Sequence, residues 1–222
     1  MTDFSYGDGE DVEYHSLQTI YINETAYIGP LLRKKAEPVD PLAKETRDTA
    51  NKLLVSAKTG TDAVGLAAPQ IGISERVFVF QVPATPGQRS IPWTVVVNPE
   101  YTPTEDKKVL MPEGCFSVPH FYSKCVPRYP SINYRYYTLE GKRVEGKATG
   151  LFAQVFQHET DHLNGILYID RLKDKNDPEL HGLMLQSQVM EERRKLEALL
   201  REKLAKDKNQ NNEKNIKNEN VH

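Results

Sequence analysis

The feature that most constrains this chain is a pair of histidines, His158 and His162, with Glu159 directly after the first. On an α-helix, residues i and i+4 lie one above the other on the same face, so both imidazoles can reach one metal ion. Glu159 would then lie beside that ion, where its carboxylate can take a proton from a bound water. This H-E-x-x-H pattern is typical of metallohydrolases. It predicts metal-assisted hydrolysis but leaves the third ligand open.

The composition narrows the class of protein further. A chain of 222 residues with 38% hydrophobic and 27% charged residues fits one globular domain with additional terminal residues. A net charge of −2 gives no reason to expect nucleic acid or an anionic membrane as partner. No apolar run approaches the roughly 20 residues of a membrane span, and the acidic N-terminus resembles neither a secretory signal nor a transit peptide. The two cysteines cannot build a disulfide framework, so we expect a cytoplasmic protein.

The hydrophobic pattern predicts both helices and strands. Asp40 as N-cap and Pro41 at the first helical position predict a helix over about 41–58. A second helix, capped by Thr149 and ending at Asn164-Gly165, carries the two histidines. An amphipathic pattern predicts a last helix over about 179–205. Strand-like runs occupy residues 77–82, 93–97 and 132–137, and the last of these is expected to form a hairpin with 143–148.

Three residue types compete for the third ligand. A histidine six residues after the second His completes one known scheme, but Tyr168 stands at that position. A downstream glutamate, Glu179 or Glu191, would complete a second scheme. Cys115 would complete a third, because Gly114 permits a backbone bend that could present a thiolate. An isolated cysteine is more often core filler.

A small, apolar segment over 64–72 contains a single amide, Gln70. One interpretation is a tight packing corner where small residues let backbones approach. The other is a substrate-lining backbone with Gln70 as a donor aimed at an oxyanion.

Taken together and in this order, these segments closely resemble peptide deformylase, whose pattern is G-Φ-G-Φ-A-A-x-Q, then E-G-C-Φ-S, then H-E-x-x-H. The resemblance implies that Cys115, His158 and His162 bind one divalent metal, natively Fe(II), although Zn(II) or Ni(II) would suit the same ligands. It makes Glu159 the general acid–base residue. It implies that the side chain of Gln70 and the backbone N–H of Phe116 polarise a formyl carbonyl.

The resemblance implies hydrolysis of the N-formyl group from N-formylmethionine of nascent polypeptides, with release of formate, close to the ribosome and without direct nucleic acid or membrane binding. Gly65 would hydrogen-bond an extended peptide, and Gly114 belongs to the same substrate site. The methionine side chain needs an apolar slot, for which the candidates are Val64, Met111, Leu151 and Val155.

The fold that we expect is α+β, with small antiparallel or mixed sheets packed around a central metal-binding helix, and with a C-terminal helix. Residues 28–205 would form the catalytic domain. Residues 1–27 would be an N-terminal extension, and the polar tail 206–222 is expected to be disordered.

The chain departs from the family pattern at two points. Ala63 replaces the first glycine, which would cost about 1–2 kcal/mol if that position needs φ > 0. The arginine that many bacterial members carry just after the second motif is absent, and Lys124 and Tyr122 are the candidates to replace its function.

Two other functions compete with a deformylase. A zinc endopeptidase would use the same helix with a glutamate as third ligand. A non-catalytic relative would only bind formylated or nascent chains.

Overall fold

The computed structural model describes residues 31–59, 63–84, 89–172 and 183–185, together with residues 191, 194, 195 and 198. Its elements, in chain order, are α1 Lys44–Thr59, β1 Gly65–Ala67, η1 Ala68–Ile71, β2 Val77–Val82, β3 Ile91–Pro103, β4 Val109–Cys115, β5 Val118–Arg128, β6 Ser131–Tyr137, β7 Arg143–Thr149, α2 Gly150–Leu163, η2 Tyr168–Arg171 and β8 Leu183–Leu185.

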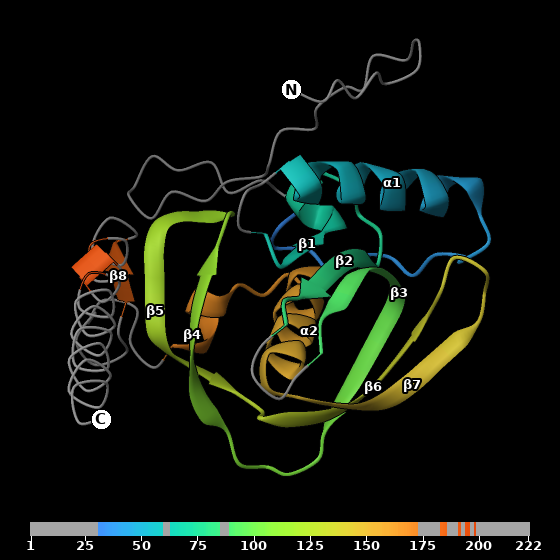
Figure 1. The fold of residues 1–222 in the computed structure, drawn as a ribbon. Coiled ribbons are helices and arrows are strands. Elements are labelled where there is room, and N and C mark those ends of the chain that lie inside the picture. Colours follow the sequence, from blue (N-terminus) through green and yellow to red (C-terminus); the bar gives the residue numbers. More distant parts are fainter. Residues whose placement is uncertain are drawn as a thin grey trace, which may run out of the picture.

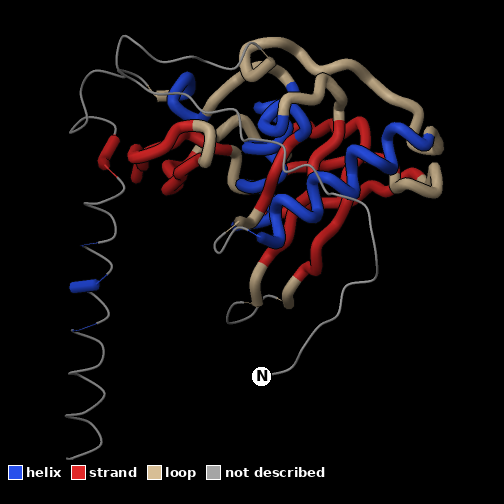
Figure 2. Tube along the Cα trace, turned by 90° about the horizontal axis from the view of Figure 1, so that it is seen from above, coloured by secondary structure: helices blue, strands red, loops and turns tan. Residues whose placement is uncertain are grey.

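The strands form two antiparallel sheets around α2. One has five strands in the order β1-β2-β3-β6-β7, and the other has three in the order β4-β5-β8 (Figure 1). The view from above shows the two groups of strands apart, with α1 crossing the larger one (Figure 2). The predicted α+β fold around a metal-binding helix is thereby confirmed. None of the helices in the described part of the chain is long and apolar enough to cross a membrane.

Strand β2 is buried on both faces because a helix covers each of them. Val77 and Val79 pack in a core with Leu53 of α1. Phe78 and Phe80 point the other way, and the Phe78 ring meets Phe156 of α2 edge to face with centroids 5.3 Å apart. This double burial explains why the run Val-Phe-Val-Phe lacks the polar alternation of a half-exposed strand.

Helix α2 starts abruptly where β7 ends. Gly150 has φ +57°, a conformation that costs glycine little, so the chain can turn from strand to helix within one residue. Thr149 occupies the N-cap position but its side chain makes no capping hydrogen bond, so the predicted capping role is wrong in that respect. The helix ends at Leu163, and Asn164-Gly165 follow it as predicted.

Two other sequence predictions need correction. The first helix begins at Lys44 instead of residue 41, because the Asp40 carboxylate accepts the N–H of Leu42 and holds a turn before the helix. Within the predicted helix 179–205, residues 183–185 form strand β8, which pairs with β5. Residues 191, 194, 195 and 198 are helical, in agreement with a C-terminal helix. The proposed extension 1–27 and tail 206–222 lie outside the described residues.

Candidate active site

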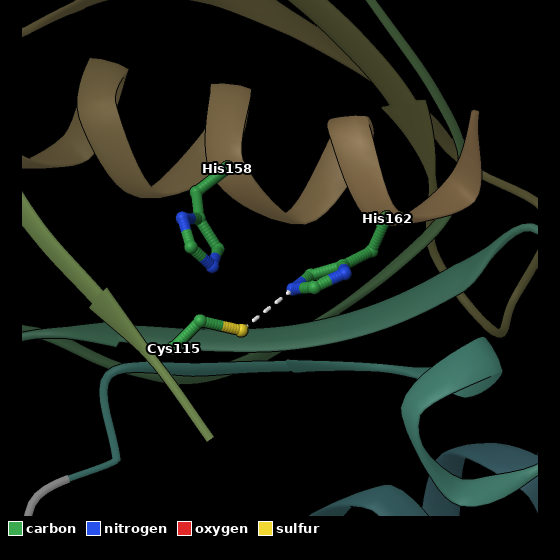
Figure 3. A group of neighbouring side chains, drawn as sticks. All are labelled: Cys115, His158 and His162. Carbon is green, nitrogen blue, oxygen red and sulfur yellow. Dashed lines mark hydrogen bonds between the residues drawn. The ribbon is translucent and has the colours of Figure 1, made fainter. Parts of the chain in front are cut away.

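Two histidines of α2 and one cysteine of β4 converge on a common point. His158 and His162 project from one face of the helix toward Cys115, the last residue of β4 (Figure 3). One ligand atom from each lies within 4.8 Å of the others. Cys115 Sγ and His162 Nε2 are 3.3 Å apart, close to the roughly 3.5 Å between two ligands of a tetrahedral metal with bonds of about 2.0–2.3 Å.

The donor chemistry of this cluster also fits a divalent metal. Burial lowers the pKa of His162 well below its usual value, which keeps that imidazole neutral and able to coordinate. At His158 burial opposes protonation, but hydrogen bonds with Cys115 and Glu113 outweigh it and raise the pKa. The surroundings of His158 therefore favour a positive charge at the place where a metal cation would bind. One thiolate and two imidazoles suit iron, zinc or nickel.

The tight turn after Cys115 presents its thiol. The β4–β5 ladder shifts register between Gly114 and Cys115, and Cys115 then pairs with Val118. Phe116 and Ser117 therefore make the turn, with Phe116 exposed and Ser117 fully buried. A bulge and turn that present the cysteine were expected from Gly114, and the structure has both.

The buried carboxylate of Glu113 orients His158 through a hydrogen bond to the ring nitrogen that is not aimed at the cluster. Glu113 Oε2 lies 2.8 Å from His158 Nδ1, which leaves His158 Nε2 to the metal cluster. The guanidinium of Arg128 donates to both oxygens of Glu113, at 2.6 and 2.8 Å. Burial alone would raise the pKa of Glu113, but the hydrogen bonds from Arg128 and His158 outweigh it and lower the pKa to about 2.

The same arginine also holds the histidine-bearing helix. Arg128 donates to Asp161, the residue before His162, and Arg171 of η2 donates to Asp161 as well. Arg128, Glu113 and Asp161 are each at most 5% exposed. One guanidinium therefore ties β4 and α2, the two elements that carry the metal-binding residues. Sequence reasoning missed Arg128 and Asp161 because nothing in the local pattern marks a buried arginine; Glu113 lay inside a recognised motif but received no role.

Glu159 packs against the backbone of β1. It is 3% exposed, and no described residue hydrogen-bonds its Oε2. A Cβ at Gly65 would lie only 2.3 Å from Glu159 Oε1, so the missing side chain of Gly65 makes room for this carboxylate. Burial raises the pKa of Glu159 to about 7, against the opposing charge of His158. A carboxylate with a pKa near neutrality is suited to accept and return a proton.

Gln70 is fixed with its amide nitrogen toward the cluster. The side chain is 2% exposed, and its Oε1 accepts the N–H of Ala67 at 2.9 Å. Its Nε2 donates to Ser117 Oγ at 3.2 Å and lies 3.7 Å from Cys115 Sγ. The structure thus supports the interpretation of this segment as part of a site, with a preoriented amide donor.

The proposed slot residues come from β4, from α2 and from the residue before β1. Val64, Leu151 and Val155 belong to the core under α2, where Val155 is buried and the other two are half-buried. Met111 is half-buried on β4. Ala63 does not have a positive φ, since Asn98 is the one non-glycine residue of the described part that does. The replacement of glycine by Ala63 therefore carries no backbone strain.

Within the described residues, neither Tyr168 nor Glu191 belongs to the cluster. Tyr168 is buried, and its ring stacks against His158 at 6.4 Å between centroids, while no described residue bonds its hydroxyl. Glu191 is exposed and forms an ion pair with Lys195. The alternative in which Glu191 is the third metal ligand is therefore wrong. Glu179 lies outside the described residues. Of the residues proposed to replace the absent arginine, Tyr122 lies opposite Gly114 on β5 and Lys124 is exposed.

An open groove of about 450 Å³ lies elsewhere, over β3, β6 and β7 near Tyr101, Tyr134 and Gly146. It contains none of the predicted site residues. The site is therefore located by the converging metal-ligating side chains and not by the size of a pocket.

Comparison with known proteins gives a consistent result. Residues 23–177 match the family model of polypeptide deformylase. The peptide deformylase of Thermotoga neapolitana is 39% identical over 144 residues, which cover 65% of this chain and 82% of that protein. The peptide deformylase of Chromohalobacter salexigens is 38% identical over 164 residues, 72% of this chain and 92% of the relative.

Solved structures agree with the sequence matches. The crystal structure of peptide deformylase from Thermotoga maritima has a TM-score of 0.57 at 34% identity and covers 72% of this chain and 99% of its own. A class I type b peptide deformylase from Acinetobacter baumannii, with Met-Ala-Ser bound, has a TM-score of 0.60 at 32% identity, with 72% and 99% covered.

Proposed function

Because the chain belongs to the polypeptide deformylase family, we propose that Cys115, His158 and His162 hold its metal ion and that Glu159 is the general acid–base residue. The protein is a hydrolase of protein biosynthesis that removes the N-formyl group from nascent polypeptides. The convergence of a thiol and two imidazoles beside a buried carboxylate carries the assignment of roles.

A bound metal would lower the pKa of a water molecule and so supply the nucleophile. We propose Fe(II) as the native ion, with Zn(II) or Ni(II) able to occupy the same ligands. Glu113 holds His158 through Nδ1, and Arg128 holds Glu113, so the first imidazole is preoriented.

Glu159 moves the proton of the reaction. It accepts a proton from the attacking water as oxygen bonds to the formyl carbon, then donates it to the amine nitrogen as the C–N bond breaks. Formate and the free amine of methionine are the products. The pKa of about 7 allows Glu159 to act in both directions near neutral pH.

Two donors stabilise the oxyanion that forms at the formyl carbon. Gln70 Nε2 is fixed in direction by the bond from Ala67 to its Oε1. The backbone N–H of Phe116 follows Cys115 in the turn and is the second donor. Donors of this kind are each worth on the order of 3 kcal/mol in the transition state.

An extended peptide would add to the open edge of β1. Among the described strands, β1 lies at the end of its sheet and pairs with β2 alone, and β4 likewise ends the smaller sheet. Gly65 of β1 and Gly114 of β4 would contact the peptide backbone. The first side chain would enter the slot of Val64, Met111, Leu151 and Val155.

We further propose that residues 28–205 form the catalytic domain, that the protein is cytoplasmic and works on chains emerging from the ribosome, and that it does not bind nucleic acid directly. The family match over 23–177 covers most of this range; it begins five residues before residue 28 and does not include 178–205. A net charge of −2 supports a partner other than nucleic acid.

The test is a formate-release assay on a formyl-Met peptide with anaerobically purified protein, with metal analysis of the same sample. Glu159→Ala should keep the metal and lose activity. Cys115→Ala should lose the metal, whereas a glutamate-liganded endopeptidase would keep it. Deformylation by Glu159→Ala would refute the mechanism, and peptide binding without turnover by the unaltered protein would favour a non-catalytic relative.

A further inference from the structure

Strand β7 forms one edge of the larger sheet. It pairs along its whole length with β6, from Arg143 opposite Tyr137 to Thr149 opposite Ser131, and no other described strand pairs with it. Figure 1 shows β7 at the rim of the sheet, on the side away from β4 and β5. An edge strand in regular register presents a row of unpaired backbone groups, which is a template for pairing with another strand.

The hydrogen-bonding pattern shows which backbone groups of β7 point outward. At the hairpin turn, the N–H of Thr138 donates to the carbonyl oxygen of Lys142 at 2.9 Å. Because hydrogen-bonded and non-hydrogen-bonded pairs alternate along an antiparallel ladder, Val144, Gly146 and Ala148 are the residues that bond to β6. The backbone N–H and C=O groups of the two residues between them therefore point out of the edge of the sheet.

These two residues, Glu145 and Lys147, carry opposite charges on either side of Gly146, the central residue of β7. Both side chains are exposed. Glu145 forms an ion pair with Arg143, whereas Lys147 has no ion pair with any described residue. A strand with charges of one sign would repel a copy of itself, but this edge carries both signs.

Antiparallel pairing of β7 with the same strand of a second copy makes these charges complementary. A two-fold axis through Gly146 uses all seven residues of the strand and sets Glu145 opposite Lys147 of the second copy, twice by symmetry. The backbone groups of both residues point outward, so these pairs are hydrogen-bonded pairs. On the inner face, the half-buried Val144 then meets Ala148 of the second copy.

A shift of the axis by one residue removes this match. An axis through Glu145 would set Glu145 against itself and Arg143 against Lys147 of the second copy. An axis through Lys147 would set Lys147 against itself. Like charges directly opposite each other on neighbouring strands are destabilising. The order of charges in β7 therefore favours the register that is centred on Gly146.

We propose that β7 is a homodimer interface, through which two copies of this chain join their five-stranded sheets edge to edge in the register centred on Gly146. The two sheets then continue as one antiparallel sheet. This interface goes beyond the proposed function, because β7 lies at the opposite edge of the sheet from β1, the strand that Glu159 contacts.

Sedimentation equilibrium of the full-length, metal-loaded protein over a range of concentrations measures the dimer. The unaltered chain should show a monomer–dimer equilibrium. Glu145→Lys and Lys147→Glu should each raise the dimer dissociation constant about tenfold or more, because each reversal makes two symmetry-related pairs repulsive. Glu100→Lys is the matched control and should leave the constant unchanged, because it reverses an exposed charge on β3, which is paired on both sides within the same sheet.

Two combinations test the register itself. The double variant Glu145→Lys/Lys147→Glu exchanges the two charges and should dimerise like the unaltered chain. An equimolar mixture of the two single variants should also form dimers, because each variant then offers the charge that the other lacks. Far-UV circular dichroism of every sample checks that the fold is unchanged.

A monomer at every concentration would overturn this inference, and so would a dimer whose dissociation constant neither single reversal affects. Weakened single variants without recovery in the double variant and in the mixture would also overturn it, because Glu145 and Lys147 of the two copies would then not face each other.

Discussion

The carboxylate of Glu159 occupies the space that a side chain on Gly65 would need. An added Cβ would lie 2.3 Å from Glu159 Oε1 and 2.7 Å from its carboxyl carbon, closer than real Cβ contacts. The backbone of β1 thereby sets the position of the proposed acid–base residue on α2. A strand that would also receive the peptide is in direct contact with the group that would move the proton.

Gly65→Ala should therefore lower kcat about 100-fold or more, because a displaced general acid–base residue loses a contribution of roughly 10²–10⁴. The metal content should stay normal, since the three ligands are not displaced. Steady-state formate release with metal analysis checks both. In a Glu159→Ala background, Gly65→Ala should lower kcat little further. A further loss as large as in the unaltered background would show that Gly65 acts through the peptide alone.

Arg128→Met should be among the most destabilising single changes in the chain. It leaves Glu113 and Asp161 buried without their shared partner, and breaking a buried pair in this way costs about 3–5 kcal/mol. Urea unfolding measures the effect. Arg135→Met is the matched control, because its pair with Glu100 has side chains 52% and 61% exposed and should contribute under about 1 kcal/mol. An equal decrease in the free energy of unfolding for both variants would contradict a special role for the buried guanidinium of Arg128.

Glu113→Gln tests whether the carboxylate behind His158 tunes the metal site. An amide keeps the size but removes the charge that favours His158 as a ligand and the ionic bond with Arg128. Loss of such a partner typically weakens metal binding about 10–100-fold. Competition with a chelator of known affinity measures the change. Chelator resistance equal to that of the unaltered protein would mean that Glu113 serves stability alone.

The helix with its two histidines was predictable because its signals are local: spacing of four residues, an apolar stripe and a glycine after the last turn. Cys115 and Gln70 became predictable only through the order of three motifs. Arg128 was not, because its partners lie 15 and 33 positions away and an arginine in a strand ordinarily indicates surface. Leu183 fits the apolar face of the predicted helix 179–205, yet residues 183–185 pair with β5 as a strand, which overrides that preference.

Gln70→Glu should lower kcat about 10²–10³-fold with a smaller change in KM, because it removes an amide donor that acts mainly on the transition state. The carboxylate can still accept the N–H of Ala67, so the backbone of this segment keeps its contact. Gln81→Glu is the matched control: it removes an amide donor to the carbonyl of Ala63 and should change kcat far less. Metal analysis must accompany the kinetics, since Gln70 Nε2 lies 3.7 Å from Cys115 Sγ. A fall in activity that follows metal loss would assign Gln70 to holding the thiol, whereas normal metal content with low kcat supports its role at the oxyanion.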